Sequence, residues 1–457
     1  MGERRSGRHL RAACCWLLVG LCLGCTSTTV VGPSVESASE TGSVSAAATV
    51  EPIAAPDRFE SARQALETLF AWLDGPAPAR ADYDRLVGSS ALTYEDFLGL
   101  RAYLLPGPWT IEGVEVERST RIAVAASSPH GDSVLWEVSV FRGQIDFYIF
   151  QLDPRDPTFD TFDEMLGLLD RYGTVRHLVA PADDCAAAVS ESGADDVVPI
   201  GSAASLYVAA SAIDRVAAGE MAWTDPIELV AEHDTVTPTD PRRVRDDVGD
   251  VLELGEVVED MVRHEDFALM DHLIAHLGRH RIETGRVPPS AQPFLRMDEY
   301  LRLTRSVSAD IRDEWALADD DRQVALLESD VAASPAVELI DLDARPIEVH
   351  AIGWFGSLRD LCELAGPLAF DEVAEPVARF IFLGNSVGPS IRIWDAAESQ
   401  AIPGLSLAVQ VARTEDGDAM VVITHIDGGA AHPGVIASAR QMNGARLIAE
   451  EVFGVAP

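Results

Sequence analysis

Residues 199–207 read Pro-Ile-Gly-Ser-Ala-Ala-Ser-Leu-Tyr, a short turn that leads into an apolar helix and places Ser202 where that helix begins. One face of the expected helix is apolar at helical spacing, and it consists of Leu206, Ala210, Ile213 and Ala217, with the end near Gly219. A serine at a helix start caps unpaired N–H groups, and the same position favours an anion or an oxyanion. Ser202 is therefore either a helix cap or a nucleophile.

The sequence around Ser202 resembles the nucleophile helix of class A β-lactamase-like serine hydrolases. The resemblance rests on residues 199–208, on Arg-Val-Ala-Ala-Gly-Glu at 215–220 and on Trp-Thr-Asp-Pro at 223–226. It is similar in particular to the actinobacterial lipoprotein branch, related to the β-lactamase-like protein encoded in clavulanic acid clusters. The resemblance implies an α+β fold: a β-lactamase/transpeptidase-like α/β/α sandwich, with helices inserted between the first and last strands of a five-stranded antiparallel sheet.

A smaller α+β domain is expected before this one, since a chain of 457 residues has room for two cores. An amphipathic helix is predicted over 57–73, followed by β-rich runs between 111 and 152. Residues 57–152 resemble the ketosteroid-isomerase-like domain that accompanies the β-lactamase-like domain in this family. A helix within 153–173 is expected to join it to the β-lactamase-like domain, 174–457.

The amino terminus has the pattern of a secretory signal. Residues 1–24 combine four arginines with an apolar run that is too short to span a bilayer. Gly24-Cys25 resembles a bacterial lipobox, although Cys22 stands where that pattern prefers Leu or Val; the lipobox implies that membrane lipid, palmitate included, is attached to Cys25. An ordinary secretory signal and an uncut membrane anchor are the alternatives. Residues 25–56 are predicted to be a flexible linker, and the protein is expected on the extracytoplasmic face of the cell membrane.

Charge and cysteine usage narrow the function further. A formal net charge of −39 argues against binding to nucleic acid or another polyanion. Four of the six cysteines lie in the segment that ends at Cys25. The other two, Cys185 and Cys362, can pair in an exported protein, and we predict a disulfide between them.

The chain contains no lysine, because all 35 of its basic residues are arginines. In the family that the sequence resembles, the serine opens an S-x-x-K motif whose lysine holds or removes the proton of the serine. Ser205 stands at that position and cannot do this at neutral pH. Arginine cannot take over the role because it stays protonated in proteins.

The second motif of the family, usually Ser-Asp-Asn, falls on Glu265, Asp266 and Phe267. Only the central aspartate is retained. Phe267 removes the amide that would contact a substrate, and Glu265 places a carboxylate where a hydroxyl would relay protons. This motif is therefore predicted to be degenerate.

The third motif, Lys-Thr-Gly or Lys-Gly-Gly on the edge strand, falls within 394–399, with its lysine on Asp395 or Ala396. Asp395 and Glu398 would repel the substrate carboxylate that the family's lysine attracts. A deacylation glutamate of the type Glu-x-x-Leu-Asn is also missing between 308 and 346. Three motifs have thus lost their chemistry while the surrounding sequence is retained.

Two further possibilities concern histidines and Glu265. His264 or Glu265 is an alternative base for Ser202. His272, His276 and His280 recur every four residues, a spacing that can bring two imidazoles to one metal ion. No cysteine or carboxylate motif completes the ligand set, so we predict neither a metal nor any other cofactor.

The sequence therefore supports two functional hypotheses. The first is a cell-envelope lipoprotein with a β-lactamase-like fold and an impaired catalytic site, which binds a peptidoglycan fragment or an envelope protein. The second is a weak Ser202-dependent hydrolase of β-lactams or esters. The missing lysine favours the first, and the retained Gly201-Ser202 favours the second.

Overall fold

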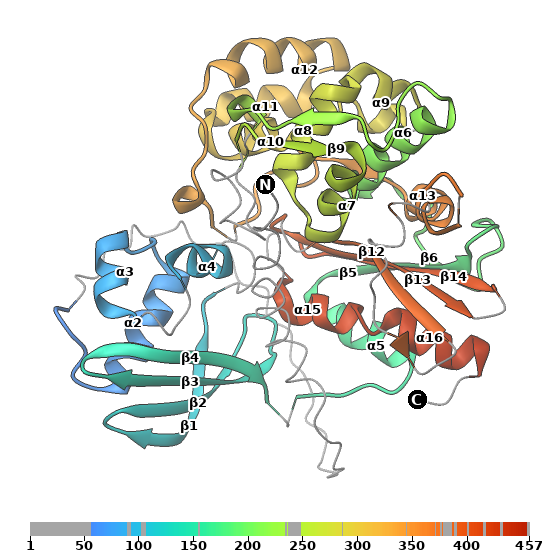
Figure 1. Cartoon of the computed structure of the whole chain (residues 1–457). Coiled ribbons are helices and arrows are strands. Elements are labelled where there is room, and N and C mark those ends of the chain that lie inside the picture. The colour runs from blue at the N-terminus through green and yellow to red at the C-terminus, as the bar shows by residue number, and fades with distance from the viewer. Residues whose placement is uncertain are drawn as a thin grey trace, which may run out of the picture. The chain divides into compact units, whose positions relative to one another are not determined.

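The computed structural model describes two compact units (Figure 1). One comprises the described residues between 56 and 156 except 93–101, and the other comprises 93–101 and the described residues from 157 onward. The residues that the structure describes are 56–88, 93–101, 107–153, 156–233, 235, 248–285, 287–343, 345–370, 372–374, 377, 386–387, 391–399, 402–414, 417–429 and 433–454.

The first unit packs two helices against a four-stranded antiparallel meander. Helix α2 (Ala62–Asp74) begins after Ser61, whose side chain accepts a hydrogen bond from the Gln64 N–H. Helix α3 (Arg80–Leu86) follows, and the sheet has the order β1-β2-β3-β4. Its strands are β1 (Thr110–Arg118), β2 (Arg121–Ser127), β3 (Ser133–Phe141) and β4 (Gln144–Leu152).

The core of this unit is aromatic. Trp136 of β3 is fully buried, and its ring contacts those of Phe70, Trp109 and Phe150. The predicted helix and the predicted strand region are confirmed as α2 and β1–β4. The resemblance of this unit to a ketosteroid-isomerase-like domain stays a prediction.

The second unit is built on a sheet of order β11-β12-β13-β14-β5-β6, in which every neighbouring pair is antiparallel. The amino-terminal strand β5 pairs with β14, near the carboxy terminus, so the helices between them are inserted into one sheet. The strands are β5 (Thr174–Pro181), β6 (Ser190–Ser192), β11 (Ser386–Val387), β12 (Ile391–Ser399), β13 (Leu405–Thr414) and β14 (Ala419–Asp427).

Helical layers cover both faces of this sheet. Side chains alternate along a strand, so one strand contributes to the cores on both faces. On β13, Leu405, Leu407, Val409 and Val411 belong to the same core as α6 (Ser205–Ala217) and α13 (Leu358–Phe370). Ala412 of β13 packs on the opposite side with α5 (Phe162–Leu169), α15 (Gly434–Gln441) and α16 (Gly444–Phe453), as Figure 1 shows.

The remaining helices of this unit lie in the inserted segment. They are α7 (Leu254–His264), α8 (Phe267–Leu277), α9 (Arg279–Gly285), α10 (Met297–Leu301), α11 (Ala309–Leu317) and α12 (Asp320–Leu326). Helix α4 (Tyr94–Gly99) groups with this unit as well. Two short strand pairs complete the unit: β7 (Val198–Pro199) with β10 (Phe355–Gly356), and β8 (Pro226–Glu228) with β9 (Val251–Glu253).

The predicted fold class is confirmed: an α+β chain with an antiparallel sheet between helical layers. The sheet has six strands where five were predicted, and the extra one is β11, a two-residue strand at the edge. The predicted disulfide is also present, since Cys185 and Cys362 are joined with an S–S distance of 2.06 Å. No helix in the described part of the chain is both long enough and apolar enough to cross a membrane.

Candidate functional site

Ser202 lies in a tight turn between strand β7 and helix α6. Gly201 has a φ of 54°, a left-handed conformation that glycine adopts without steric cost, and residues 201–204 form a 3-10 turn, η3 (Gly201–Ala204). The Ile200 N–H donates to the Trp354 carbonyl at 2.9 Å, which holds the turn against β10. Helix α6 starts at Ser205, three residues later than the sequence predicts, with Ala204 as its N-cap.

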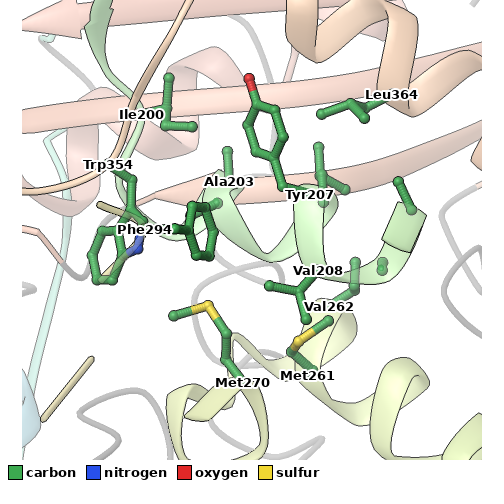
Figure 2. Close-up of a cluster of buried hydrophobic side chains, with 14 of the residues drawn as sticks. Ile200, Ala203, Tyr207, Val208, Met261, Val262, Met270, Phe294, Trp354 and Leu364 are labelled. Carbon is green, nitrogen blue, oxygen red and sulfur yellow. The ribbon is translucent and has the colours of Figure 1, made fainter. Parts of the chain in front are cut away.

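The turn is packed into the largest core of the second unit. Figure 2 shows Ala203, Tyr207 and Val208 among side chains from distant segments, including Phe294, Met261 and Met270. Ser202 is 2% exposed and Ser205 is buried as well. Ser202 is not the N-cap of α6, so the helix-cap interpretation does not describe its position.

Among the described residues, the structure brings the Glu265 side chain to Ser202. The Ser202 hydroxyl donates a hydrogen bond from Oγ to Glu265 Oε1 at 2.8 Å, between residues 63 positions apart. Glu265 follows the last residue of α7 and has φ 49° and ψ 42°, while its N–H donates to the Met261 carbonyl. Its side chain is half-buried.

The other two residues of the predicted second motif have structural roles. The Asp266 carboxylate accepts a hydrogen bond from the Leu269 N–H at 3.1 Å and so caps helix α8. Phe267 is buried in the core beside Met270 and Leu273. His264, the other candidate base, lies 3.8 Å from Asp260 through its Nε2.

The predicted third motif lies on strand β12, which packs beside η3 and α7. The register is interrupted between Asp395 and Ala397, so Ala396 sits at a β-bulge. Asp395 pairs with Gln410 and Glu398 with Ala408. Side chains of β12 lie outside the described part of the chain, so the assignment of this motif to Asp395 or Ala396 stays a prediction.

A histidine that the sequence interpretation missed supports the turn from the sheet side. His425 of β14 is fully buried, and its Nε2 lies 2.9 Å from the Pro199 carbonyl oxygen. A carbonyl only accepts, so His425 Nε2 carries the proton of this hydrogen bond. Burial lowers the pKa of His425 to about 4. The contact arises from the tertiary packing of β14 against β7, which belongs to a different strand pair, so no local sequence pattern reveals it.

His272, the first of the three regularly spaced histidines, forms hydrogen bonds with backbone groups. His272 Nδ1 lies 2.7 Å from the Ala268 carbonyl, and the Val230 N–H donates to His272 Nε2 at 2.8 Å. His276 and His280 are exposed. Among the described residues, no three His, Cys, Asp or Glu side chains are grouped as metal ligands.

Beside His272, Asp271 joins three segments of the inserted region. Its carboxyl group accepts hydrogen bonds from Thr235 Oγ1, from the Met297 N–H and from the Asp298 N–H. Burial raises the pKa of Asp271 to about 8, with the nearby Asp298 adding to the shift. The residue fixes the start of α10 relative to α8.

The arrangement of Ser202 and Glu265 sets what this site can do chemically. A serine hydroxyl within 2.6–3.2 Å of a base is the general geometry of an activated nucleophile. A carboxylate is nevertheless the weaker base, because its reference pKa is roughly six units below that of a lysine amine. The site therefore has a hydroxyl, a hydrogen-bond acceptor and little driving force for proton removal.

Comparisons with known proteins give a likeness to solved structures only. The structure of the β-lactamase from Sphaerobacter thermophilus is 15% identical, and the match covers 66% of this chain and 100% of that one with a TM-score of 0.42. PBP-A is 12% identical, with 64% and 96% covered and a TM-score of 0.41. An ancestral class A β-lactamase is 15% identical, with 64% and 99% covered and a TM-score of 0.41.

No protein-family model and no curated protein sequence matches the chain. Likenesses at such low identity and with TM-scores below 0.5 establish neither an activity nor a ligand for this chain. The function must be argued from the residues around Ser202.

Proposed function

We propose that this protein is a β-lactamase-like lipoprotein of the cell envelope that binds a peptidoglycan fragment at the site around Ser202 and has lost fast acyl transfer. The observation that carries the proposal is the hydrogen bond from Ser202 to Glu265 in a chain that contains no lysine. In place of an amine, the candidate nucleophile faces a carboxylate.

The burial of Ser202 supports a binding function over turnover. An acyl carbon must approach to about 3–3.5 Å from the attacking oxygen in a reactive complex. Ser202 is 2% exposed, whereas Glu265 is half-buried. The Ser202 hydroxyl is therefore poorly accessible to an acyl compound that comes from solvent.

The loss of turnover is tested with a fluorescent penicillin and a fluorophosphonate probe, followed by the intact mass of the purified protein. We expect no covalent adduct on the wild type. An adduct that disappears in Ser202→Ala and persists in Ser205→Ala overturns the proposal.

Binding is tested by co-sedimentation of the purified protein with peptidoglycan sacculi. We expect the protein to sediment with the sacculi and Glu265→Gln to weaken this binding. If the protein stays in solution in the presence of sacculi but co-purifies with another envelope protein, the ligand is a protein partner and not a wall fragment.

A second candidate function is weak hydrolysis with Glu265 as the base, and the 2.8 Å distance from Ser202 Oγ to Glu265 Oε1 favours it. The Ser202 oxygen would bond to the acyl carbon while its proton passes to Glu265, and the leaving group would depart with that proton. Water would then cleave the acyl-serine ester and release the acid.

This candidate makes a distinct prediction for turnover. Slow hydrolysis of an activated ester such as p-nitrophenyl acetate would be lost in both Ser202→Ala and Glu265→Gln, and it would be retained in Ser205→Ala. Background hydrolysis that is equal in all four proteins excludes it.

A further inference from the structure

We infer that formation of the Cys185–Cys362 disulfide completes the site around Ser202, because the disulfide fastens one end of a clasp whose other end is the Ser202 turn. The clasp consists of residues 182–200 and residues 354–366, which run antiparallel to each other. The inference concerns how the site of the proposed function is assembled, and it does not depend on which ligand the site takes.

At the disulfide end, three contacts hold helix α13 to the segment after β5. A Cβ at Gly366 would lie 2.2 Å from the Ala182 carbonyl oxygen, so a glycine is needed for this close approach. Cys185 and Cys362 form the disulfide next to it. Arg359, one turn earlier in α13, donates from Nη1 to the Cys185 carbonyl. This end of the clasp thus combines a covalent bond with close backbone packing.

The middle of the clasp is held by Arg359 and by a short strand pair. The Arg359 N–H donates to the Ala194 carbonyl, and its guanidinium group pairs with Glu191 and Asp195. Beyond Arg359, β7 pairs with β10, and each of these strands is two residues long. Even a complete isolated two-stranded hairpin is marginally stable. This strand pair therefore depends on the contacts on either side of it.

The last contact of the clasp lies two residues before Ser202. The Ile200 N–H donates to the Trp354 carbonyl at 2.9 Å, and both residues lie beside the turn in Figure 2. His425 contacts the neighbouring Pro199 carbonyl from the sheet. The clasp therefore fixes the backbone from which the Ser202 side chain reaches its acceptor.

The disulfide shortens the loop that must close before Ile200 meets Trp354. Roughly two dozen residues separate the two through the disulfide, against about 150 along the chain. The entropy of loop closure scales with the logarithm of loop length, so this contact should be roughly tenfold to twentyfold more favourable in the oxidised chain. The ladders of β5, β14 and β13 do not use the clasp. We therefore expect the reduced chain to form the sheet while the clasp opens and closes.

The oxidation that fastens the clasp needs an oxidant with a disulfide of its own, such as an exported thiol oxidoreductase or glutathione disulfide. The thiolate of one cysteine attacks the oxidant and releases one of its sulfurs as a thiolate. The second cysteine thiolate then attacks the protein sulfur of the mixed disulfide and releases the other. The two cysteine thiols together lose two protons and two electrons, and the oxidant becomes two thiols.

The test is hydrogen–deuterium exchange, read by mass spectrometry, on the wild type and on Cys185→Ala/Cys362→Ala. We expect the amides of residues 200–207 to exchange at least roughly tenfold faster in the double variant, because the open clasp exposes them. The amides of α8, which is not part of the clasp, should change much less. Wild-type protein that is unfolded in urea, reduced and refolded should show the same fast exchange over 200–207. Glutathione disulfide should then restore the slow exchange.

Two variants separate a local effect from a loss of stability. Leu447→Ala is the matched control, since Leu447 is buried in the core on the other face of the same sheet. It should accelerate exchange over 200–207 and over α8 to similar extents. Arg359→Gln keeps the disulfide and loosens the middle of the clasp, so it should accelerate exchange over 200–207 by a few fold and leave α8 unchanged.

Three results overturn the inference. The first is equal exchange over 200–207 in the double variant and the wild type. The second is an acceleration in the double variant that is as large over α8 as over 200–207. The third is a double variant that does not fold, because the disulfide would then be a requirement of the whole unit. Unchanged exchange over 200–207 in Arg359→Gln also contradicts the clasp.

The inference and the proposed function fail separately. Co-sedimentation with sacculi together with unchanged exchange over 200–207 in the double variant removes the inference and leaves the binding function. An oxidised wild type that does not sediment with sacculi removes the binding function, whatever the exchange of the Ser202 turn.

Discussion

Glu265 adopts a left-handed backbone conformation at the position where its carboxylate reaches Ser202. A residue with a Cβ pays roughly 1–2 kcal/mol for this conformation, and helices usually place glycine or asparagine there. The hydrogen bond to Ser202 offsets part of that cost, since a net contribution of about 1 kcal/mol is typical. The local strain and the site contact are thus coupled in one residue.

This coupling can be measured with a double-mutant cycle. Glu348→Gly should change the free energy of unfolding by a few tenths to about 1 kcal/mol in the stabilising direction, because it relieves the same strain at an exposed residue with φ 48°. Glu265→Gly should come out about 1 kcal/mol lower, because it also removes the acceptor of Ser202. In a Ser202→Ala background this difference should shrink by the contribution of that hydrogen bond, as measured by urea unfolding. An unchanged difference there would mean that the hydrogen bond contributes nothing.

His425 predicts an acid-dependent loss of stability. Its pKa is lowered to about 4 in the folded protein, against roughly 6.5 in an unfolded chain. The unfolded state therefore binds the extra proton first. The contribution is complete above about pH 6.5 and is lost as pH falls toward 4, up to roughly 3 kcal/mol.

The comparison protein for this prediction is His425→Gln, whose amide can still donate to the Pro199 carbonyl but does not titrate. Urea unfolding at pH 7 and pH 4.5 should show a smaller acid loss in the variant, by about 2–3 kcal/mol. Equal losses in the two proteins would assign the acid sensitivity to other groups.

At the scale of elements, the disulfide ties α13 to the segment after β5. Cys185 and Cys362 are separated by 177 residues, which include the whole inserted region up to the first turns of α13. Arg359 reinforces the same junction, because it donates to the Cys185 carbonyl and pairs with Glu191 and Asp195. The disulfide and the contacts of Arg359 thus both hold α13 to the residues around the edge strand β6.

The disulfide should contribute about 3–5 kcal/mol to stability, because closing so long a loop restricts the unfolded chain. Cys185→Ala/Cys362→Ala should lower the midpoint of urea unfolding accordingly, and reductant should then have no further effect. Arg359→Gln is the milder companion variant, since exposed ion pairs contribute little. A midpoint that is the same in the double variant and the wild type contradicts this assignment.

The same scale shows what the sequence could reveal. Local patterns and cysteine position predicted a helix over 57–73, the strands between 111 and 152 and the pairing of the two cysteines. The helix is α2 (Ala62–Asp74), which begins five residues later than predicted, after its cap Ser61. The pairing of β7 with β10, more than 150 residues away, left no local signal. The 3-10 turn before α6 also escaped prediction, because helix periodicity alone does not distinguish a tight first turn.

The sequence predicts which residues belong to the candidate site, but it does not predict which of them lie next to one another. Ser202 and Glu265 were both singled out by sequence, and His264 was an equal candidate for the base. Which of the two candidate bases reaches Ser202 depends on how α7 ends. Glu265, the residue after His264, adopts a left-handed conformation and its carboxylate contacts Ser202. His264 instead lies next to Asp260, one turn earlier in the helix. That is a property of tertiary packing.

At the scale of the whole molecule, the charge of the chain bears on how it stays at the membrane. Cytoplasmic and envelope membranes carry anionic lipids, which attract basic segments. This chain has 74 acidic and 35 basic residues, so its net charge is repelled by such lipids. Under the lipoprotein proposal, attachment therefore depends on the lipid at Cys25, a residue outside the described part of the chain.

This dependence gives the last prediction. Each buried acyl CH₂ contributes about 0.8 kcal/mol, and stable anchoring takes two acyl chains or one chain with a basic patch. Since the chain is strongly acidic overall, Cys25→Ser should move the full-length protein from the membrane pellet to the soluble fraction, while a high-salt wash should leave the wild type in the pellet. Mass spectrometry of the wild type should find the acyl groups on an amino-terminal Cys25. A Cys25→Ser protein that stays in the membrane until detergent is added would instead favour an uncut signal segment as the anchor.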